Sequence, residues 1–300
     1  MHRRTSLLAR RCSVAIACAV ALSGCDQFLG DFWGTKREEA VNLFKRVEDG
    51  DQLAFEALVE RTKSLDPNAA MQLGFVLQTG AGRFPKADRE AELAYMVASG
   101  KIKEADFNLG LLKLKERQID EAVSHFEKAA GKERDGLTNA MVNLGKIYEA
   151  GLAGAPRSAS LAAEWYEYAA NAGDLYARQK LGMILVMGRG RPVDVKRGLA
   201  LVENAALLGD RQARLQLARW YDSPPSREIQ QSREVAAKWL LVAAEGIPDL
   251  ERWAEAYRLR LSERERRNVD DAISLWRSSH PPAKDTPDYG QPINLGELAG

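Results

Sequence analysis

The amino-acid sequence predicts an all-α fold built from stacked helical hairpins. A Leu-Gly pair, or Leu-Ala in the last copy, occurs five times at spacings of 36, 35, 37 and 36 residues. An alanine stands four residues before each leucine, which places both side chains on one face of a helix. No alternating apolar pattern long enough for a β-strand interrupts the series. The leucines are Leu73, Leu109, Leu144, Leu181 and Leu217, and the alanines are Ala69, Ala105, Ala140, Ala177 and Ala213.

Each repeat continues into a second helix, which ends in a pair of small residues and a glycine. Small residues let two helices approach closely, and glycine adopts the left-handed conformation of a helix C-cap at little cost. A single hairpin cannot bury its own apolar face, so the units must stack, each against its neighbours. We assign residues 67–247 to five such repeats. The second helices end at Ala98 and Gly100, Ala130 and Gly131, Ala170 and Gly173, Ala206 and Gly209, and Ala244 and Gly246.

The loops between the helices indicate a family. In the fourth unit Gly188, Gly190, Pro192 and Asp194 lie between the two helices, and these residues resemble Sel-one-like repeats, a relative of the tetratricopeptide repeat with a longer loop. The second unit has a shorter spacing and resembles a plain tetratricopeptide repeat. The resemblance implies a right-handed α-solenoid that works by binding other molecules.

Helical caps are expected on both sides of the repeats, over residues 35–66 and 248–280, because terminal repeats need polar covers. Ser262 and Glu265 have the spacing of a capping box, which predicts a helix that runs through Trp276. Residues 281–300 contain four prolines and three glycines, so we predict a disordered tail there.

The first 24 residues have the layout of a secretory signal. They contain four arginines, no acidic residue and an apolar run from Val14 to Leu22, which is too short to span a bilayer comfortably. Leu22, Ser23, Gly24 and Cys25 resemble the lipobox of bacterial lipoproteins. This resemblance implies cleavage before Cys25, acylation of its thiol with palmitate-type chains, and a lipidated linker over residues 25–34. We therefore expect a periplasm-facing lipoprotein of the bacterial cell envelope, with Asp26 slightly favouring the inner membrane.

The processed chain offers few groups for catalysis. Cys12 and Cys18 leave with the signal, so no thiol or disulfide remains once Cys25 is acylated. His125 takes the position that Trp165 has in the next unit, which indicates a packing role. We predict no catalytic residue, no metal site and no cofactor. Without the four signal arginines the formal charge is −3, which does not suggest nucleic-acid binding.

Polar residues precede the signature leucines. In tetratricopeptide-like repeats the first helix of each hairpin lines the concave face, so the resemblance implies that these residues face a groove. An amide offers both a donor and an acceptor to the backbone of an extended peptide, and the likeness to tetratricopeptide peptide clamps is best at Asn108 and Asn143. Lys146 and Arg219 lie three residues after members of the series and would add positive charge. The alternative is that these positions are polar because solvent reaches them. The series is Gln72, Asn108, Asn143, Lys180 and Gln216.

We therefore predict a lipid-anchored scaffold that binds protein or peptide segments in envelope assembly, secretion or exopolysaccharide export. Two alternatives stay open. One is direct binding of cell-wall glycan or polysaccharide, which favours exposed aromatic residues along the groove. The other is a carboxylate-dependent hydrolase of envelope polymers, for which Glu164, Glu167 and Asp174 are the nearest acids, although charged residues at such positions are usually solvated.

Overall fold

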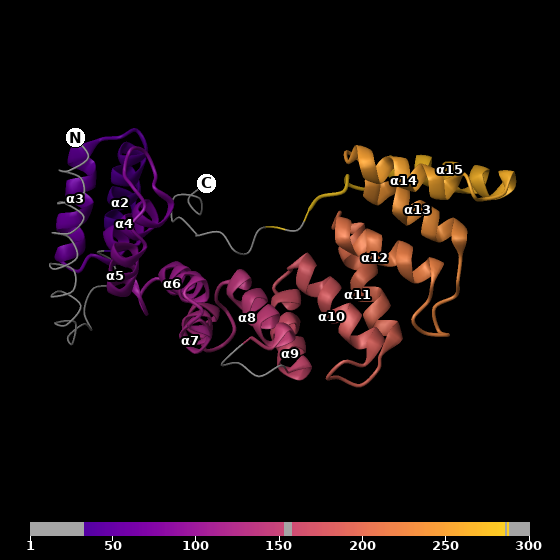
Figure 1. Cartoon of the computed structure of the whole chain (residues 1–300), viewed down its shortest axis with the longest axis horizontal. Helices are drawn as coiled ribbons and strands as arrows, with labels where there is room; N and C mark the ends of the chain where they lie inside the picture. Colours follow the sequence, from indigo (N-terminus) through magenta and orange to yellow (C-terminus); the bar gives the residue numbers. More distant parts are fainter. Residues whose placement is uncertain (1–32, 153–157, 286, 288–300) are drawn as a thin grey trace. The chain divides into compact units, whose positions relative to one another are not determined.

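The computed structural model describes residues 33–152, 158–285 and 287 (Figure 1). The signal segment, Cys25 and most of the predicted linker lie outside the described residues. Fourteen helices and one isolated backbone bridge account for the regular structure of the described part, so the all-α prediction is confirmed. The helices are α2 (Trp33–Glu48), α3 (Gln52–Lys63), α4 (Pro67–Thr79), α5 (Asp88–Ala98), α6 (Lys103–Lys115), α7 (Ile119–Ala130), α8 (Thr138–Ala150), α9 (Ala159–Asn171), α10 (Leu175–Met187), α11 (Val195–Leu207), α12 (Arg211–Asp222), α13 (Arg233–Ala244), α14 (Pro248–Arg258) and α15 (Glu263–Arg277).

The chain divides into two compact units, which we describe separately. Among the described residues, unit 1 runs to Ala140 and contains α2 to α7, and unit 2 begins at Met141, within α8, and continues through α15.

In unit 1 consecutive helices pair into hairpins. α4 packs on α5, α6 packs on α7, and α2 and α3 both contact α4. The alanine and leucine that the spacing places on one helix face are completely buried in both hairpins, at Ala69 and Leu73 and again at Ala105 and Leu109. Asp66 begins α4 because its carboxylate accepts hydrogen bonds from the backbone amides of the first turn.

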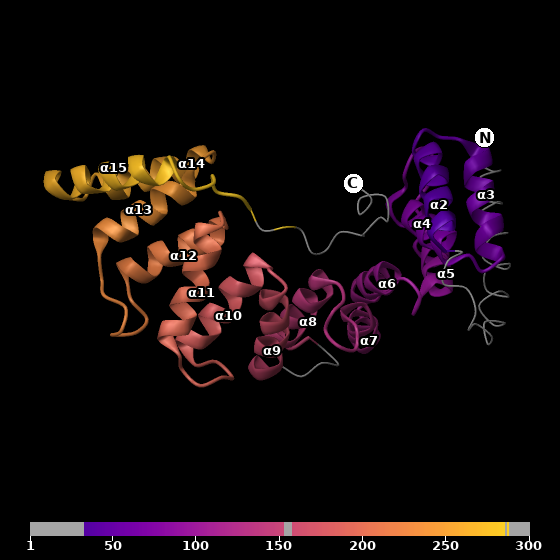
Figure 2. The same cartoon turned by 180° about the vertical axis from the view of Figure 1, so that it is seen from behind.

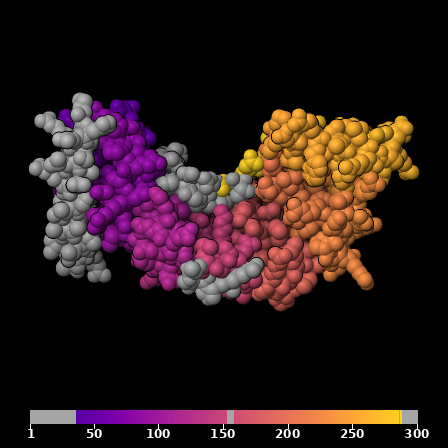
Figure 3. Space-filling view, viewed as in Figure 1, coloured from indigo at the N-terminus to yellow at the C-terminus, as the bar shows by residue number. Residues whose placement is uncertain are grey.

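In unit 2 the same pairing continues. α10 packs on α11 and α12 on α13, while α13 also contacts α14 and α15. Figure 3 shows the neighbouring hairpins of this unit as one packed surface from the red repeat to the gold helices. Ser262 and Glu265 form the predicted capping box at the start of α15, with both reciprocal hydrogen bonds present. The other helices of this unit whose caps accept a backbone hydrogen bond begin after Ser158, Asp174, Asp194, Asp210 and Ser232.

The glycine that follows the signature leucine leaves space for an aromatic ring to pack against the backbone of the first helix. A Cβ atom added to Gly110 would lie 2.6 Å from the ring of Phe126, and one added to Gly145 would lie 2.5 Å from the ring of Tyr166. Atoms that are not bonded do not approach so closely. Any residue larger than glycine at these positions would therefore force the ring or the helix to move. Gly74 and Tyr95 make the same pair in the first repeat, at 2.6 Å.

The segment after α15 is ordered where disorder was predicted. The backbone of Lys284 donates to Gly209 O at 2.8 Å and accepts from Arg211 N at 2.9 Å, so the chain returns to the start of α12. The yellow segment that follows α15 can be traced in both views (Figures 1 and 2). The prediction of a disordered tail is therefore wrong for residues 281–285, which we call the C-terminal strap, and its remainder at 288–300 lies outside the described residues.

Arg214 holds the strap in place from inside the fold. Its guanidinium is completely buried and donates to the carbonyl oxygens of Ala206 at 3.0 Å, Val242 at 3.1 Å and Pro281 at 2.7 Å. These carbonyls come from the ends of α11 and α13 and from the strap. One side chain therefore ties two hairpins and the returning chain together, which no local sequence pattern reveals.

We expect Gly110→Val to lower the free energy of unfolding by about 1–3 kcal/mol, because the new side chain overlaps the ring of Phe126 in a closely packed interior. Urea denaturation followed by circular dichroism measures the change. In a Phe126→Ala background the same substitution should cost much less, because the ring is gone. An equal cost in both backgrounds would show that the ring is not what excludes a side chain at this position.

Candidate functional site

The predicted series of groove residues is mostly buried. In unit 1 the side chains of Gln72 and Asn108 have no exposed surface, and in unit 2 Asn143 and Gln216 are 6% exposed. The prediction that these amides face an open groove is wrong, because all four pack inside the fold, and Lys180 is the one member of the series that is partly exposed. The spacing in the sequence predicts which residues share a helix face, but it does not predict whether a neighbouring element covers that face.

Lys146 and Lys180, two of the predicted groove residues, lie near the same tyrosine ring in unit 2. Lys180 Nζ lies 3.1 Å from Glu149 Oε2, and Tyr166 Oη donates to the same oxygen at 2.8 Å. Lys146 Nζ and Lys180 Nζ lie 5.0 and 5.5 Å from the ring centre of Tyr176. Burial alone would lower the pKa of Lys180, but Tyr176 and Glu149 outweigh it and raise the pKa above its usual value. Lys180 therefore stays charged and links α8 to α10.

An apolar hollow of about 430 Å³ lies between α12, α13 and α14. Leu215, Leu240 and Leu250 contribute to its lining, together with Trp253, which is 56% exposed. Arg219, one of the predicted groove residues, is exposed and also lines the hollow. This is the part of unit 2 where a predicted groove cation and an accessible apolar surface occur together.

Two of the three polar groups that line the hollow are hydrogen-bonded to each other. Tyr257 Oη donates to Asp222 Oδ1 at 2.5 Å. Burial and the neighbouring Asp222 carboxylate raise the pKa of Tyr257 to about 12, so the phenol stays protonated and remains a donor at neutral pH. Arg219 has no side-chain hydrogen bond or ion pair within the described part of the chain, which leaves its charge available to a partner.

Sequence reasoning missed Trp253, although a signal was present. Trp253 lies as far beyond Gly246 as Gln216 lies beyond Gly209, so it occupies the next position in the predicted series. Trp165, Trp220 and Trp239, by contrast, are buried in the core of unit 2.

The acids considered for hydrolysis have structural partners in unit 2. Glu167 pairs with Arg191 at 3.3 Å and with Arg197 at 2.5 Å. Asp174 accepts from Ala177 N at 2.7 Å, and Glu164 accepts from Tyr168 Oη at 3.2 Å. Glu167 therefore belongs to ion pairs, Asp174 to a helix cap, and Glu164 to a side-chain hydrogen bond.

His125 belongs to a hydrogen-bonded cluster in unit 1. Its Nδ1 atom lies 3.2 Å from Asp106 Oδ1, and Asp106 also accepts from Ser99 Oγ at 2.6 Å and from Gly100 N at 2.8 Å. Burial opposes ionisation of Asp106, but His125 and the other two donors outweigh it and lower the pKa of this carboxyl. The half-buried position of His125 agrees with the predicted packing role.

The described residues contain no group of three or more histidine, cysteine, aspartate or glutamate side chains placed to hold a metal ion. Within the same residues no helix combines the length and the apolar character needed to cross a membrane.

Comparison with known proteins identifies the repeats. Residues 103–132, 138–174 and 175–210 match the Sel1 repeat family, so three of the five predicted repeats are confirmed as Sel1 repeats. The first of these matches is the unit whose shorter spacing resembled a plain tetratricopeptide repeat.

Two solved structures are similar to this chain. The crystal structure of a Sel1 repeat protein from Oxalobacter formigenes is 26% identical in sequence, covering 69% of this chain and 83% of that protein, with a TM-score of 0.59. A protective antigen present in uropathogenic Escherichia coli strains and displaying an SLR fold is 14% identical, covering 81% of this chain and 61% of that protein, with a TM-score of 0.45. No curated protein matches the chain.

We expect Asp106→Asn to lower the free energy of unfolding by about 1–3 kcal/mol at neutral pH, because a charged acceptor of three hydrogen bonds is lost. The folded state lowers the pKa of Asp106, so its ionised form stabilises the fold above the ordinary aspartate pKa and loses this effect as the pH falls through the lowered value. Urea titrations at several pH values should therefore show the two proteins converging in acid. Asp49→Asn, at an exposed position of the same unit, is the control, and an equal pH-dependent loss there would contradict the assignment.

Proposed function

From the Sel1 repeats that the chain contains, we propose that this protein is a lipid-anchored scaffold of the bacterial cell envelope that binds a segment of a partner protein. The Sel1 repeat fold itself suggests a scaffold for protein–protein interaction. We place the binding site at the apolar hollow between α12, α13 and α14, and we assign the protein to assembly, secretion or polysaccharide export in the envelope.

The hollow carries the proposal because its residues have the composition of an interface centre. Tryptophan, tyrosine and arginine are enriched among the residues that dominate binding energy, and Trp253, Tyr257 and Arg219 line this one site. Burying the exposed part of a tryptophan side chain is among the more favourable steps available to a protein interface. A partner segment with an apolar anchor residue and a nearby carboxylate matches both the floor and the charge of Arg219.

The exposed Trp253 by itself fits a glycan as well as a peptide, but the rest of the lining favours a protein segment. A hydroxyl-rich sugar loses hydrogen bonds to water when it enters an aliphatic site, and that loss costs free energy unless polar groups replace them. Leucine and alanine side chains form most of the hollow, and Asp222 is already hydrogen-bonded to Tyr257.

The same lining supports a binding role over hydrolysis. Glycosidases need two carboxyl groups on either side of the scissile bond. Asp222 is the one carboxylate that lines the hollow.

The proposed anchor places unit 1 next to the membrane. Cys25 precedes the start of α2 at Trp33 by eight residues. A fully extended chain spans at most about 3.3–3.6 Å per residue, so a lipid on Cys25 would keep the first residue of α2 within about 30 Å of the bilayer surface. Two or more acyl chains make such an anchor stable. In this arrangement the scaffold faces the periplasm, and we favour the inner membrane.

We expect Trp253→Ala to weaken partner binding by about 30-fold, because the central aromatic residue of an interface commonly contributes 2 kcal/mol or more. A photo-crosslinking amino acid at position 250 identifies the partner in living cells, and titration of that purified partner into the full chain measures the affinity. Leu275→Ala removes another exposed apolar side chain of unit 2, 75% exposed and outside the lining of the hollow, and should leave the affinity within twofold of the parent. Equal effects of both changes would place the binding site elsewhere.

We expect Cys25→Ala to move the protein from the membrane fraction to the soluble fraction, because the proposed lipid would be attached to the sulfur atom of Cys25. Incorporation of a labelled palmitate analogue measures acylation in parallel with fractionation. Cys18→Ala, within the predicted signal, serves as the control and should retain both label and membrane association. Membrane association of the Cys25→Ala protein without label would point to an uncleaved signal segment as the anchor.

A further inference from the structure

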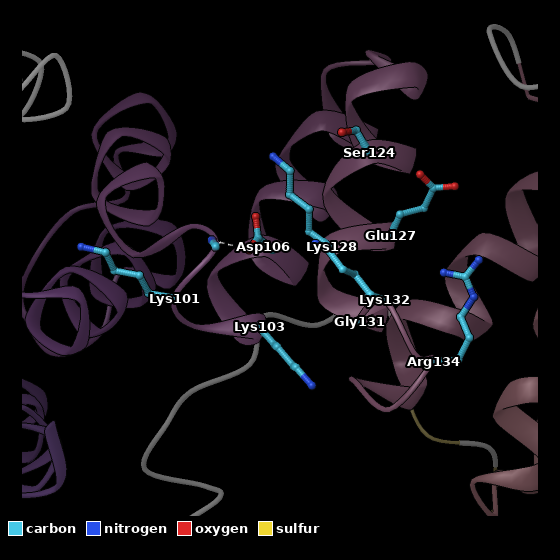
Figure 4. A pocket seen from close by; sticks show the side chains of 10 residues that line it. Lys101, Lys103, Asp106, Ser124, Glu127, Lys128, Gly131, Lys132 and Arg134 are labelled. Atoms are coloured by element: carbon cyan, nitrogen blue, oxygen red, sulfur yellow. Dashed lines mark hydrogen bonds between the residues drawn. The ribbon is translucent and has the colours of Figure 1, made fainter. Parts of the chain in front are cut away.

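A second hollow, of about 600 Å³, lies in unit 1 and has a different chemistry. Figure 4 shows that its side chains come from two segments. Lys101 and Lys103 belong to the turn before α6 and its first residue, and Lys128, Lys132 and Arg134 belong to the end of α7 and the loop that follows. We call this hollow the basic bowl. Gly100, Asp106, Ser124, Glu127 and Gly131 complete its lining.

Positive charge exceeds negative charge in the basic bowl. Five lysine and arginine side chains line it against two carboxylates, whereas the whole chain carries a formal charge of +1. Asp106 is buried and already accepts three hydrogen bonds, from Ser99, Gly100 and His125. A hollow with an excess of one charge concentrates its field and attracts ions of the opposite sign.

Three lysines of the basic bowl have charges that are not used in strong contacts within the described residues. Lys128 and Lys132 are exposed and form no side-chain hydrogen bond or ion pair with any described residue. Lys103 lies 3.6 Å from a carboxylate oxygen of Asp135, and both side chains are exposed, which makes this a weak pair.

The loop between α7 and α8, which carries Lys132 and Arg134, is closed by backbone hydrogen bonds. Gly136 N donates to Ala130 O at 2.9 Å and Arg134 N donates to Gly131 O at 3.2 Å, which closes the loop on itself. Arg134 has a φ of 59°, a left-handed conformation that is unfavourable for a residue with a Cβ atom. The fold maintains this conformation with an arginine, although glycine would adopt it without strain.

The lining indicates the class of ligand. Every side chain that lines the basic bowl is polar or charged, and the two remaining residues are glycines, so the bowl contains no apolar side chain, and its apolar surface comes from the stems of polar residues and from the backbone. Its volume falls within the range of small-ligand sites, about 300–1,000 Å³. A compact ligand with several negative charges fits these conditions better than a peptide segment that buries apolar side chains.

We propose that the basic bowl binds a phosphate-bearing anion. A phosphate monoester carries close to two negative charges at neutral pH and offers several acceptor oxygens, so it can engage more cations at once than a single carboxylate. Lysine binds phosphate as a mobile point charge. The hydroxyl of Ser124 supplies a further donor. The ligand is either a soluble phosphate compound or the headgroup of an anionic phospholipid, and the site is independent of the hollow at Trp253.

The test uses the full chain with Cys25→Ser, which cannot be acylated at that residue and so removes membrane binding through a lipid there. Isothermal titration with inorganic pyrophosphate at low ionic strength measures the soluble source. Cosedimentation with vesicles of phosphatidylglycerol and phosphatidylcholine, compared with phosphatidylcholine alone, measures the lipid source. We expect binding in at least one arm, and we expect Lys128→Gln with Lys132→Gln to weaken it by about tenfold or more, because two charge-assisted hydrogen bonds are lost.

The matched control is Lys45→Gln with Lys86→Gln, which removes the same charge from two exposed positions of unit 1 that do not line the bowl. Binding that survives in the control and is lost in the bowl variant supports the proposal, and the arm in which it occurs identifies the source. No binding in either arm, or an equal loss in both variants, overturns it. Tighter binding of a poly-glutamate peptide than of both phosphate probes, with the same dependence on Lys128 and Lys132, would also overturn the phosphate assignment.

Discussion

The contact between a helix glycine and a ring on the partner helix is the constraint from which the hairpins of this protein are built. At Gly110 and Gly145 the ring of the second helix occupies the space that a Cβ atom would need. Because protein interiors are close-packed, this contact limits how far apart the two helices can lie. In the fourth repeat the same close approach is reached without a ring, since Gly182 and Gly198 place the two helix backbones in direct contact. In four of the five repeats a glycine of the first helix therefore lets the second helix approach closely, while the group that fills the space changes from a ring to a helix backbone.

The tyrosines that occupy these places also connect the core to the polar parts of the fold. Tyr95 Oη donates to Gln78, and Tyr166 Oη donates to Glu149, so each buried ring ends at a hydrogen-bond acceptor. Glu149 in turn pairs with Lys180 of the next repeat. One chain of contacts thus passes from a glycine of α8 through Tyr166 to a charged pair between neighbouring hairpins, and packing within one repeat determines where the charges of the next are held.

At the end of unit 2 the strap covers one side of the last hairpins, whereas a hollow on the other side leaves apolar surface accessible. Arg214 joins the ends of α11 and α13 to the strap, and its guanidinium lies 5.5 Å from the ring centre of Trp276. This arrangement covers the last hairpins, as a terminal repeat requires. On the other side α14 packs against α13 and leaves a hollow between itself and α12, so Trp253 stays accessible while Gln216, at the corresponding position of α12, is buried.

The sequence by itself determined the hairpins, because the features that specify them are local. An alanine and a leucine four residues apart define one face of a helix, a small pair with glycine ends the next helix, and Ser262 with Glu265 begins α15. Only the tertiary structure decided which polar residues are accessible. Spacing places Asn108 and Trp253 at similar positions on first helices, yet neighbouring elements bury the first and leave the second exposed. The strap has the same origin, because residues 281–285 are far in the sequence from the helices that they contact. The cations of the basic bowl lie in two segments of one hairpin, and the packing of α6 on α7 brings those segments together.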